Sequence, residues 1–218
     1  MKMMTNLFST FDPCTGWMSM NWLSLFSILV MPKKFWAMNN PTMNMMMTMM
    51  NSTIKETESN TKIKGMSIMS NSMIMTIMTV NMMGLIPYVF TPSAHLTFSL
   101  TLSLPMWVSF MIYGWLKKTH NMMEHLVPMS TPSMLMPFMV MIETISNMIR
   151  PGSLAVRLSA NMIAGHMIMS LLGNSTSSLL KMATMAMLYL ILMMFESAVA
   201  VIQSYVFVTL SSLYSSEI

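Results

Sequence analysis

The chain has 218 residues and a formal net charge of +4, from 11 Lys and Arg against 7 Asp and Glu. Only 8% of its residues are charged, against about 25% in soluble domains. Hydrophobic residues make up 54%, and the mean hydropathy is +0.59. So few charges cannot cover the surface of a soluble protein of this size, so the composition predicts an integral membrane protein. The single cysteine, Cys14, excludes an internal disulfide framework.

Five apolar segments predict an all-α membrane fold with about five spans. The last two exceed the roughly 20 residues that an upright span needs, so we expect them to be tilted and to form an antiparallel hairpin. A proline, Pro105, is expected to kink the third span. The expected spans are about Trp17–Met31, Met66–Val89, His95–Leu116, Ser133–Gly173 and Leu179–Tyr214.

The connections between these spans differ in polarity. Asn39–Lys64 is polar, and we expect either an interfacial amphipathic helix or a loop there; Asn121–Pro132 is expected as a short connection. The whole chain forms one membrane domain, divided into 1–64, 65–132 and the hairpin 133–218. Lys and Arg gather in the first and third connections, which the positive-inside rule assigns to the compartment of synthesis. The N-terminus is then outside and the C-terminus inside.

Methionine is unusually frequent, with 38 residues. One interpretation is a set of thioether ligands for a soft metal such as Cu(I). We favour a general replacement of Leu and Ile, because methionines occur in every span and in the loops, and Met fills apolar space without strict shape demands. The four His residues form no convincing metal or haem set, and His95, His120 and His125 fall in or near loops. We therefore expect no cofactor and no metal.

The fourth predicted helix carries ionisable residues at regular intervals. Glu143, Arg150 and Arg157 are spaced by seven and share one stripe, which Asn161 extends. His166 follows Arg157 by nine residues and turns to roughly the opposite face. An ionisable residue at membrane depth costs about 2.5–3.5 kcal/mol on insertion scales. The position of Arg157 at membrane depth therefore indicates a functional role for this residue.

The fifth predicted helix carries Glu196 and Gln203 on one stripe. In an antiparallel hairpin with its turn near residue 180, one register places Arg157 level with Gln203 and His166 level with Glu196. This arrangement indicates proton handling, because histidine titrates nearest to neutrality. His166 and Glu196 lie on the turn side of Arg157, which cannot be deprotonated in practice and can block direct proton passage while attracting a carboxylate of another protein.

Structural alternatives stay open for several of these residues. Arg150 could be an interfacial residue whose side chain reaches toward water, and His166 a structural hydrogen bonder. Asn161 and Gln203 could serve only as interhelical hydrogen bonders. An ion pair of Arg157 with Glu143 is disfavoured, since they are about 21 Å apart along one helix. The chain has no Gly-rich phosphate loop, so no nucleotide site is expected.

Several stretches resemble the subunit a family of the mitochondrial F-type ATP synthase. They cover nearly the whole chain, and the AVRLSAN element is highly specific. Before Thr131-Pro132 the usual Gln-Gly of the family is replaced by Met129-Ser130, which concerns the connection before the fourth helix. The matching stretches are NLFSTFDP, NMMGLIPYVFTPSAHLT, MPFMVMIETIS, IETISNMIRPGSLAVRLSANMIAGH, LLGN and ESAVAVIQSYVFVTLSSLY.

The resemblance implies a proton-translocating stator subunit in the mitochondrial inner membrane, with its N-terminus in the intermembrane space and its C-terminus in the matrix. Its partners would be a rotating ring of c subunits with membrane-embedded carboxylates, other membrane and peripheral-stalk subunits, and lipid. ATP chemistry would lie on other subunits. Nucleic acid is not an expected partner.

The resemblance also assigns roles to individual residues. Arg157 looks like the essential arginine that faces the ring, with Asn161 and Gln203 as its polar neighbours. His166 and Glu196 resemble the pair of the proton-uptake path, and Glu143 resembles the acidic residue of the release path. The alternatives are a stand-alone proton-coupled transporter, although no internal repeat is present, and a purely structural membrane scaffold.

Overall fold

The computed structural model describes residues 7–14, 18–30, 41–61, 65–87, 89–127, 132, 134–174 and 179–217. All regular structure in these ranges is helical, which confirms the all-α fold. The 3-10 helices are η1 (Leu7–Phe11), η2 (Met20–Val30) and η3 (Pro92–Ala94), and the α-helices are α1 (Pro41–Asn60), α2 (Met66–Gly84), α3 (Leu96–Lys117), α4 (Thr119–Leu126), α5 (Met136–Asn174) and α6 (Leu179–Glu217).

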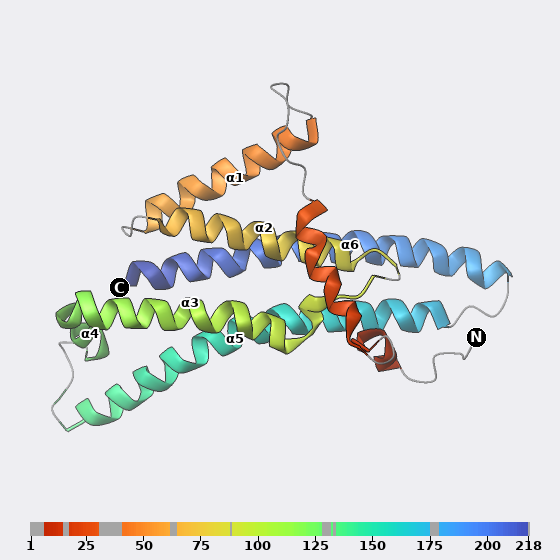
Figure 1. Cartoon of the computed structure of the whole chain (residues 1–218). Coiled ribbons are helices and arrows are strands. Elements are labelled where there is room, and N and C mark those ends of the chain that lie inside the picture. Colours follow the sequence, from red (N-terminus) through yellow and green to blue (C-terminus); the bar gives the residue numbers. More distant parts are fainter. Residues whose placement is uncertain are drawn as a thin grey trace.

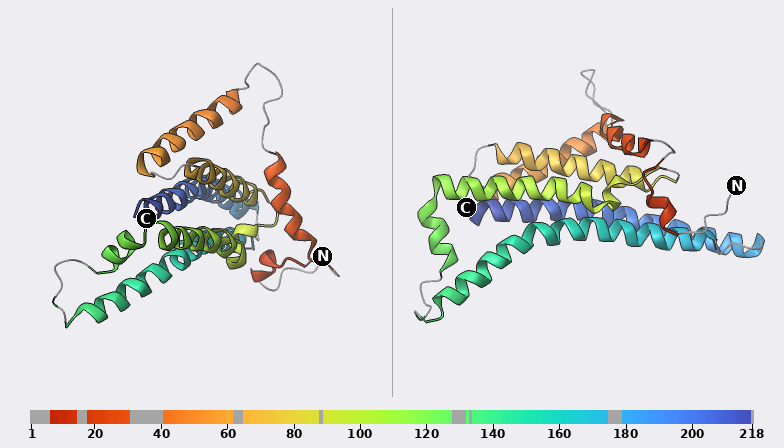
Figure 2. Two further views of the ribbon diagram at one scale, coloured as in Figure 1. Left: turned by 60° about the vertical axis from the view of Figure 1, so that its left-hand side comes forward. Right: turned by 60° about the horizontal axis from the view of Figure 1, so that its bottom comes forward.

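Four helices, α2, α3, α5 and α6, run side by side and form the body of the molecule (Figures 1 and 2). Three described stretches are long and apolar enough to cross a membrane: Leu96–Lys117, Met136–Asn174 and Ala183–Ser216. The 19 residues of α2, about 28 Å at the rise of an α-helix, pack along α6. The chain is thus a multi-pass helical membrane protein.

The buried core lies where α2 meets the two longest helices. Burial of branched and aromatic side chains from all three helices holds α2 against the α5–α6 pair and fixes α5 and α6 relative to each other. The core consists of Ile74 and Ile77 from α2, Leu154 and Leu158 from α5, and Phe207 and Val208 from α6.

Helices α5 and α6 have 39 residues each and lie antiparallel, as predicted. Each is about 58 Å long, well beyond the roughly 30 Å of a bilayer's hydrocarbon core. We call the end with Asn174 and Leu179 the hairpin end, and the end with Met136 and Glu217 the open end. Helix α6 begins at Leu179, as predicted, and residues 175–178, where the turn is expected, lie outside the described ranges.

Helix α5 is bent, so that its first part diverges from the other helices while the remainder runs beside α6 (Figure 2). Pro151 lies inside this helix. A proline within a helix removes one backbone hydrogen bond and clashes with the preceding turn, which is a common cause of such bends. The divergence leaves space between α5 and its neighbours at the open end.

Three connecting regions differ from the sequence-based expectation or resolve its alternatives. Asn39–Lys64 contains a helix, α1, which contacts α2 and α6. The expected connection Asn121–Pro132 is partly helical, since α4 continues to Leu126. In the region of the first expected span, the described η2 has 11 residues and lies across the bundle in Figure 1; residues 31–40 and Met129-Ser130 lie outside the described ranges.

Candidate functional site

The middle of the hairpin holds a polar pair and an exposed arginine. The Asn161 side chain on α5 donates a hydrogen bond from Nδ2 to Oε1 of Gln203 on α6, at 3.1 Å. Gln203 is buried, whereas Arg157 is exposed on the outer surface of α5. Within the described part of the chain Arg157 has no ion-pair partner. Its positive charge is therefore presented outward, toward whatever borders this face of the hairpin.

Glu196 lies deeper in the hairpin, between Arg157 and the hairpin end. Its side chain is only 6% exposed, and its Oε1 atom has no hydrogen-bond partner among the described residues. A Cβ atom placed on Gly165 of α5 would collide with this carboxylate. Glycine at position 165 therefore makes the space that the carboxylate occupies, and the two helices approach each other closely at this level.

His166 is half-buried beside this glycine and lines a cavity of about 540 Å³, the hairpin-end cavity. Its Nε2 atom is buried and has no partner in the described ranges, and its ring meets Phe11 of η1 edge to face, with centroids 6.3 Å apart. The chain's amino-terminal segment thus covers the end of α5. Polar residues of the cavity include Asp12, Asn21, His166, Ser170 and Tyr189.

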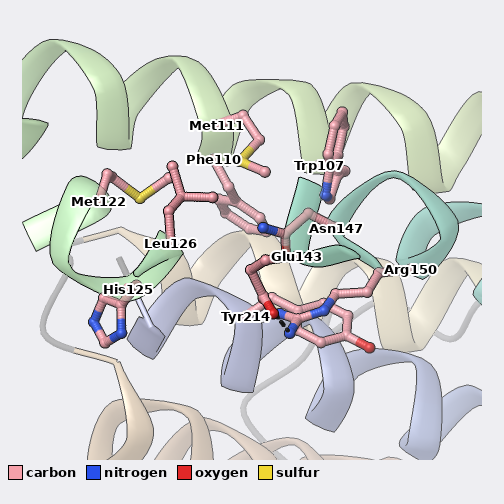
Figure 3. A pocket seen from close by; sticks show the side chains of 10 residues that line it. All are labelled: Trp107, Phe110, Met111, Met122, His125, Leu126, Glu143, Asn147, Arg150 and Tyr214. Carbon is pink, nitrogen blue, oxygen red and sulfur yellow. Dashed lines mark ion pairs between the residues drawn. The ribbon is translucent and has the colours of Figure 1, made fainter. Parts of the chain in front are cut away.

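The open end of the hairpin has a second, smaller cavity of about 240 Å³, the open-end cavity, which lies between α3, α4, α5 and α6. Glu143 and Arg150 line it and form an ion pair with Oε1 and NH2 3.8 Å apart (Figure 3). The Arg150 guanidinium carbon also lies 5.1 Å from the centroid of the Tyr214 ring of α6. The bend of α5 provides room for this cavity.

The structure brings most of the predicted residues onto the hairpin but adjusts their pairing. Gln203 bonds Asn161, which lies one turn beyond Arg157, the residue expected at its level. His166 and Glu196 both lie toward the hairpin end, without a hydrogen bond between them in the described part of the chain. Glu143 pairs with Arg150 and not with Arg157, in agreement with the distance argument from the sequence.

Sequence reasoning did not identify several residues of these sites. Gly165 could have been found, because a glycine inside a long helix costs about 1 kcal/mol relative to alanine and needs a reason. Asn81 in α2 is fully buried, and neither polar atom of its amide has a partner within the described residues. Asp12 and Tyr214 give no local sequence signal, since only the fold brings them to the cavities.

Other ionisable residues lie away from the hairpin's centre. His120 in α4 pairs with Glu124 at 3.3 Å on the exposed surface, and His95 contacts the rings of Trp22 and Phe90. Tyr205, which had no predicted role, donates a hydrogen bond to Glu56 of α1 at 2.8 Å. Over the described ranges, no group of three or more His, Cys, Asp or Glu side chains is arranged to hold a metal ion.

The fold and these sites define a class: a multi-pass helical membrane protein with ionisable residues inside a long hairpin, where such residues are costly and serve a function. Comparison with known proteins is more specific. Residues 14–216 match the ATP synthase A chain family. The ATP synthase subunit a of Aedes albopictus is 50% identical, that of Locusta migratoria 49% and that of Drosophila melanogaster 48%, each over 99% of this chain and 100% of the relative.

The chain therefore belongs to the ATP synthase A chain family. Membership gives it a role in the membrane sector of an F-type ATP synthase, together with other subunits of that enzyme.

Proposed function

We propose that this chain is the proton-translocating stator subunit of the ATP synthase membrane sector, acting on a rotating ring whose subunits carry carboxylates at membrane depth. The observation that carries the proposal is Arg157, an exposed arginine without a partner in the described part of the chain, on a helix that crosses the membrane. A guanidinium left in hydrocarbon is costly. A carboxylate of a neighbouring subunit would neutralise it.

The apolar surface around Arg157 supports a protein partner on this face. Exposed side chains such as Ile149, Val156 and Ile168 continue along α5, and Met194 and Ile202 along α6. The small residues Ala160 and Ala164 lie exposed near Arg157 and allow close helix approach. A second helical subunit fits this surface.

Two separate paths lead to this face under the proposal. Protons enter through the hairpin-end cavity, past His166 and Glu196, and load a ring carboxylate. They leave past Glu143 through the open-end cavity. His166 lies about 14 Å from Arg157 along α5, and Glu143 about 21 Å on the other side. Among the described residues, Arg157 lines neither cavity, and it lies between the two paths.

Arg157 couples the two paths. A guanidinium does not release its proton at accessible pH, so it cannot relay protons between the cavities. It attracts each ring carboxylate in its charged form, so that a carboxylate must lose its proton to the release path before it passes. Asn161 and Gln203, which bond each other beside Arg157, fix the two helices at this level. The free energy of the proton gradient then drives rotation.

The surroundings of the chain follow from the same proposal. We place it in the mitochondrial inner membrane, with the hairpin end toward the intermembrane space and the open end toward the matrix. Lys117, which ends α3 at the open end, and Lys118 beside it, agree with that orientation under the positive-inside rule. An exposed Arg157 outside both cavities argues against a stand-alone transporter, which would place its charged residues along an internal pathway.

The decisive experiment compares Arg157→Ala with the native complex in sealed vesicles. We expect loss of ATP-driven proton pumping and of coupled ATP synthesis, together with a new passive proton leak, because the barrier between the two paths is removed. Lys118→Gln, which removes a positive charge from the connection at the open end, is the matched control and should pump normally. Undiminished pumping by Arg157→Ala would overturn the proposed function.

A further inference from the structure

Arg150 occupies a defined place at the open end that neither the resemblance nor the family assigns. It follows Glu143 by seven residues, a rise of about 10 Å, so both side chains must extend along the helix to meet. Their charged groups are 3.8 Å apart, and their side chains are 27% and 39% exposed, respectively for Arg150 and Glu143. Both lie on the wall of the open-end cavity (Figure 3).

A second helix holds the guanidinium in this place. The Tyr214 ring of α6 lies under the Arg150 guanidinium, 5.1 Å from centroid to carbon. A cation over an aromatic face is attracted by the negative charge of the ring's faces, and Arg stacks on such rings better than Lys because its charged group is planar. The contact therefore fixes the guanidinium relative to α6, whereas an exposed ion pair alone would leave it mobile.

Among the described residues that line the open-end cavity, the pair has two further ionisable neighbours, His125 and Tyr214. His125 of α4 lines the same cavity, and in Figure 3 it lies apart from the ion pair. The wall formed by α3 contributes Trp107, Phe110 and Met111, none of which titrates. Among the described residues that line this cavity, Glu143 is thus the only carboxylate, and Arg150 is the cation paired with it.

We propose that Arg150, supported by Tyr214, is a positioning residue for Glu143 in proton release. This inference rests on the proposed function. When a ring carboxyl releases its proton and the proton reaches Glu143, the O–H bond of the ring carboxyl breaks and an O–H bond forms on Glu143. The Glu143 carboxyl becomes neutral and its attraction to Arg150 is lost. When that proton passes to bulk water at the cavity mouth, the carboxylate regains its charge and returns to the guanidinium. The pair thereby restores the geometry of the acceptor after each transfer.

The test measures the initial rate of ATP-driven proton pumping per assembled complex in vesicles. Arg150→Gln removes the charge, and we expect pumping to fall about tenfold, since a misplaced reacting group can cost more than this. Arg150→Lys keeps the charge but loses the planar stack, so its pumping rate should lie between those of the native complex and Arg150→Gln. Tyr214→Leu should lose about fivefold, whereas Tyr214→Phe, which keeps the ring, should stay within about twofold of native.

A double-mutant cycle separates positioning from structural support. If Arg150 acts through Glu143, then Arg150→Gln should cause no further loss once Glu143→Gln is present, because residues that act together are not additive. Additive losses would overturn the inference, and so would native rates in Tyr214→Leu. If Arg150→Gln fails to assemble, Arg150→Lys and the two Tyr214 variants still decide the matter.

Controls distinguish this inference from the proposed function. Lys118→Gln removes a positive charge elsewhere at the open end, and it should pump at the native rate. Arg157→Ala, assayed in the same vesicles, tests the function itself. If Arg157→Ala stops pumping while Arg150→Gln and Tyr214→Leu pump normally, the function stands and the positioning role is wrong. If Arg157→Ala pumps normally, the function is wrong.

Discussion

The two ends of the hairpin hold their ionisable groups in opposite ways. At the hairpin end, Nε2 of His166 and Oε1 of Glu196 are buried without partners in the described ranges. At the open end, Glu143 and Arg150 are paired, and the arginine stacks on a tyrosine. Buried polar groups are usually bonded, so these two unpartnered ionisable groups set the hairpin end apart from the ion pair at the open end.

The difference teaches that the two ends are suited to different steps. A group without a partner can accept or donate a proton, or bond a water molecule, without breaking an existing contact. A group in an ion pair must leave its partner first, and returns to it afterward. Under our proposal, uptake at the hairpin end is therefore governed by how well space is kept for Glu196, whereas release at the open end is governed by the pair around Glu143.

The largest expected effect comes from filling the space beside Glu196. Gly165→Ala places a methyl group where the carboxylate lies. The carboxylate is the far end of a flexible side chain, so it should move while the helices stay in place. A displacement of about 1 Å at a reacting group can lower a rate about 100-fold. We expect proton pumping to fall at least about tenfold, with normal assembly of the complex.

The matched control is Gly152→Ala in the same helix, where an added Cβ meets nothing within 4 Å. It should pump at the native rate and gain helix stability, since alanine is favoured over glycine by about 1 kcal/mol. Adding Glu196→Asp to Gly165→Ala shortens the acidic side chain and should recover part of the lost rate. Native pumping by Gly165→Ala would show that the position of the Glu196 carboxylate does not limit uptake.

The boundary between the two ends gives a smaller effect. Asn161→Ala and Gln203→Ala each break the hydrogen bond between these side chains, and the net contribution of such a bond is about 1 kcal/mol, or about fivefold in rate. We expect each to reduce coupled pumping by about that factor, and the double variant to reduce it little further. Thermal unfolding and pumping rates of the native protein, the two single variants and the double variant measure the coupling between the two residues. Fully additive losses would mean that Asn161 and Gln203 act separately.

Much of this comparison could be predicted from the sequence, since it follows from spacing along helices. The interval of seven between Glu143, Arg150 and Arg157 predicts a shared stripe, and the antiparallel hairpin places His166 and Glu196 toward the same end. In the structure Glu143 and Arg150 pair with each other, and Glu196 lies against Gly165, next to His166. The register agrees to within about one helical turn, since Glu196 meets the residue next to His166 and Gln203 bonds Asn161, one turn beyond Arg157.

Contacts between distant segments could not be predicted. The stack of Arg150 on Tyr214 joins residues of two helices, and nothing in either helix's pattern signals it. The cover of η1 over His166 depends on how the amino-terminal segment returns to α5. The space at Gly165 depends on the close approach of α6. Each of these depends on packing in three dimensions, whereas periodicity describes one helix at a time.

The smallest expected effect is on the reactivity of Cys14. This cysteine follows Asp12, which lines the hairpin-end cavity, by two residues. The Cys14 backbone N–H donates to Oδ1 of Asp12 at 3.1 Å. A side-chain hydrogen bond with Asp12, followed by the negative charge of that carboxylate, raises the pKa of the exposed Cys14 thiol above its ordinary value. A raised thiol pKa means less thiolate at any pH below it, and the thiolate is the reactive form.

Asp12→Asn should therefore speed alkylation of Cys14 by N-ethylmaleimide at pH 8 by about threefold. The gain should vanish at a pH above the raised pKa, where both proteins are fully thiolate, and Asp12→Glu should keep the slow rate. Equal rates at pH 8 would mean that the carboxylate does not act on the thiol.

With a membrane-impermeant maleimide on oriented vesicles, the same cysteine reports which compartment the hairpin end faces. Labelling from the intermembrane-space side is expected, and labelling from the matrix side would reverse the assignment of uptake and release to the two ends.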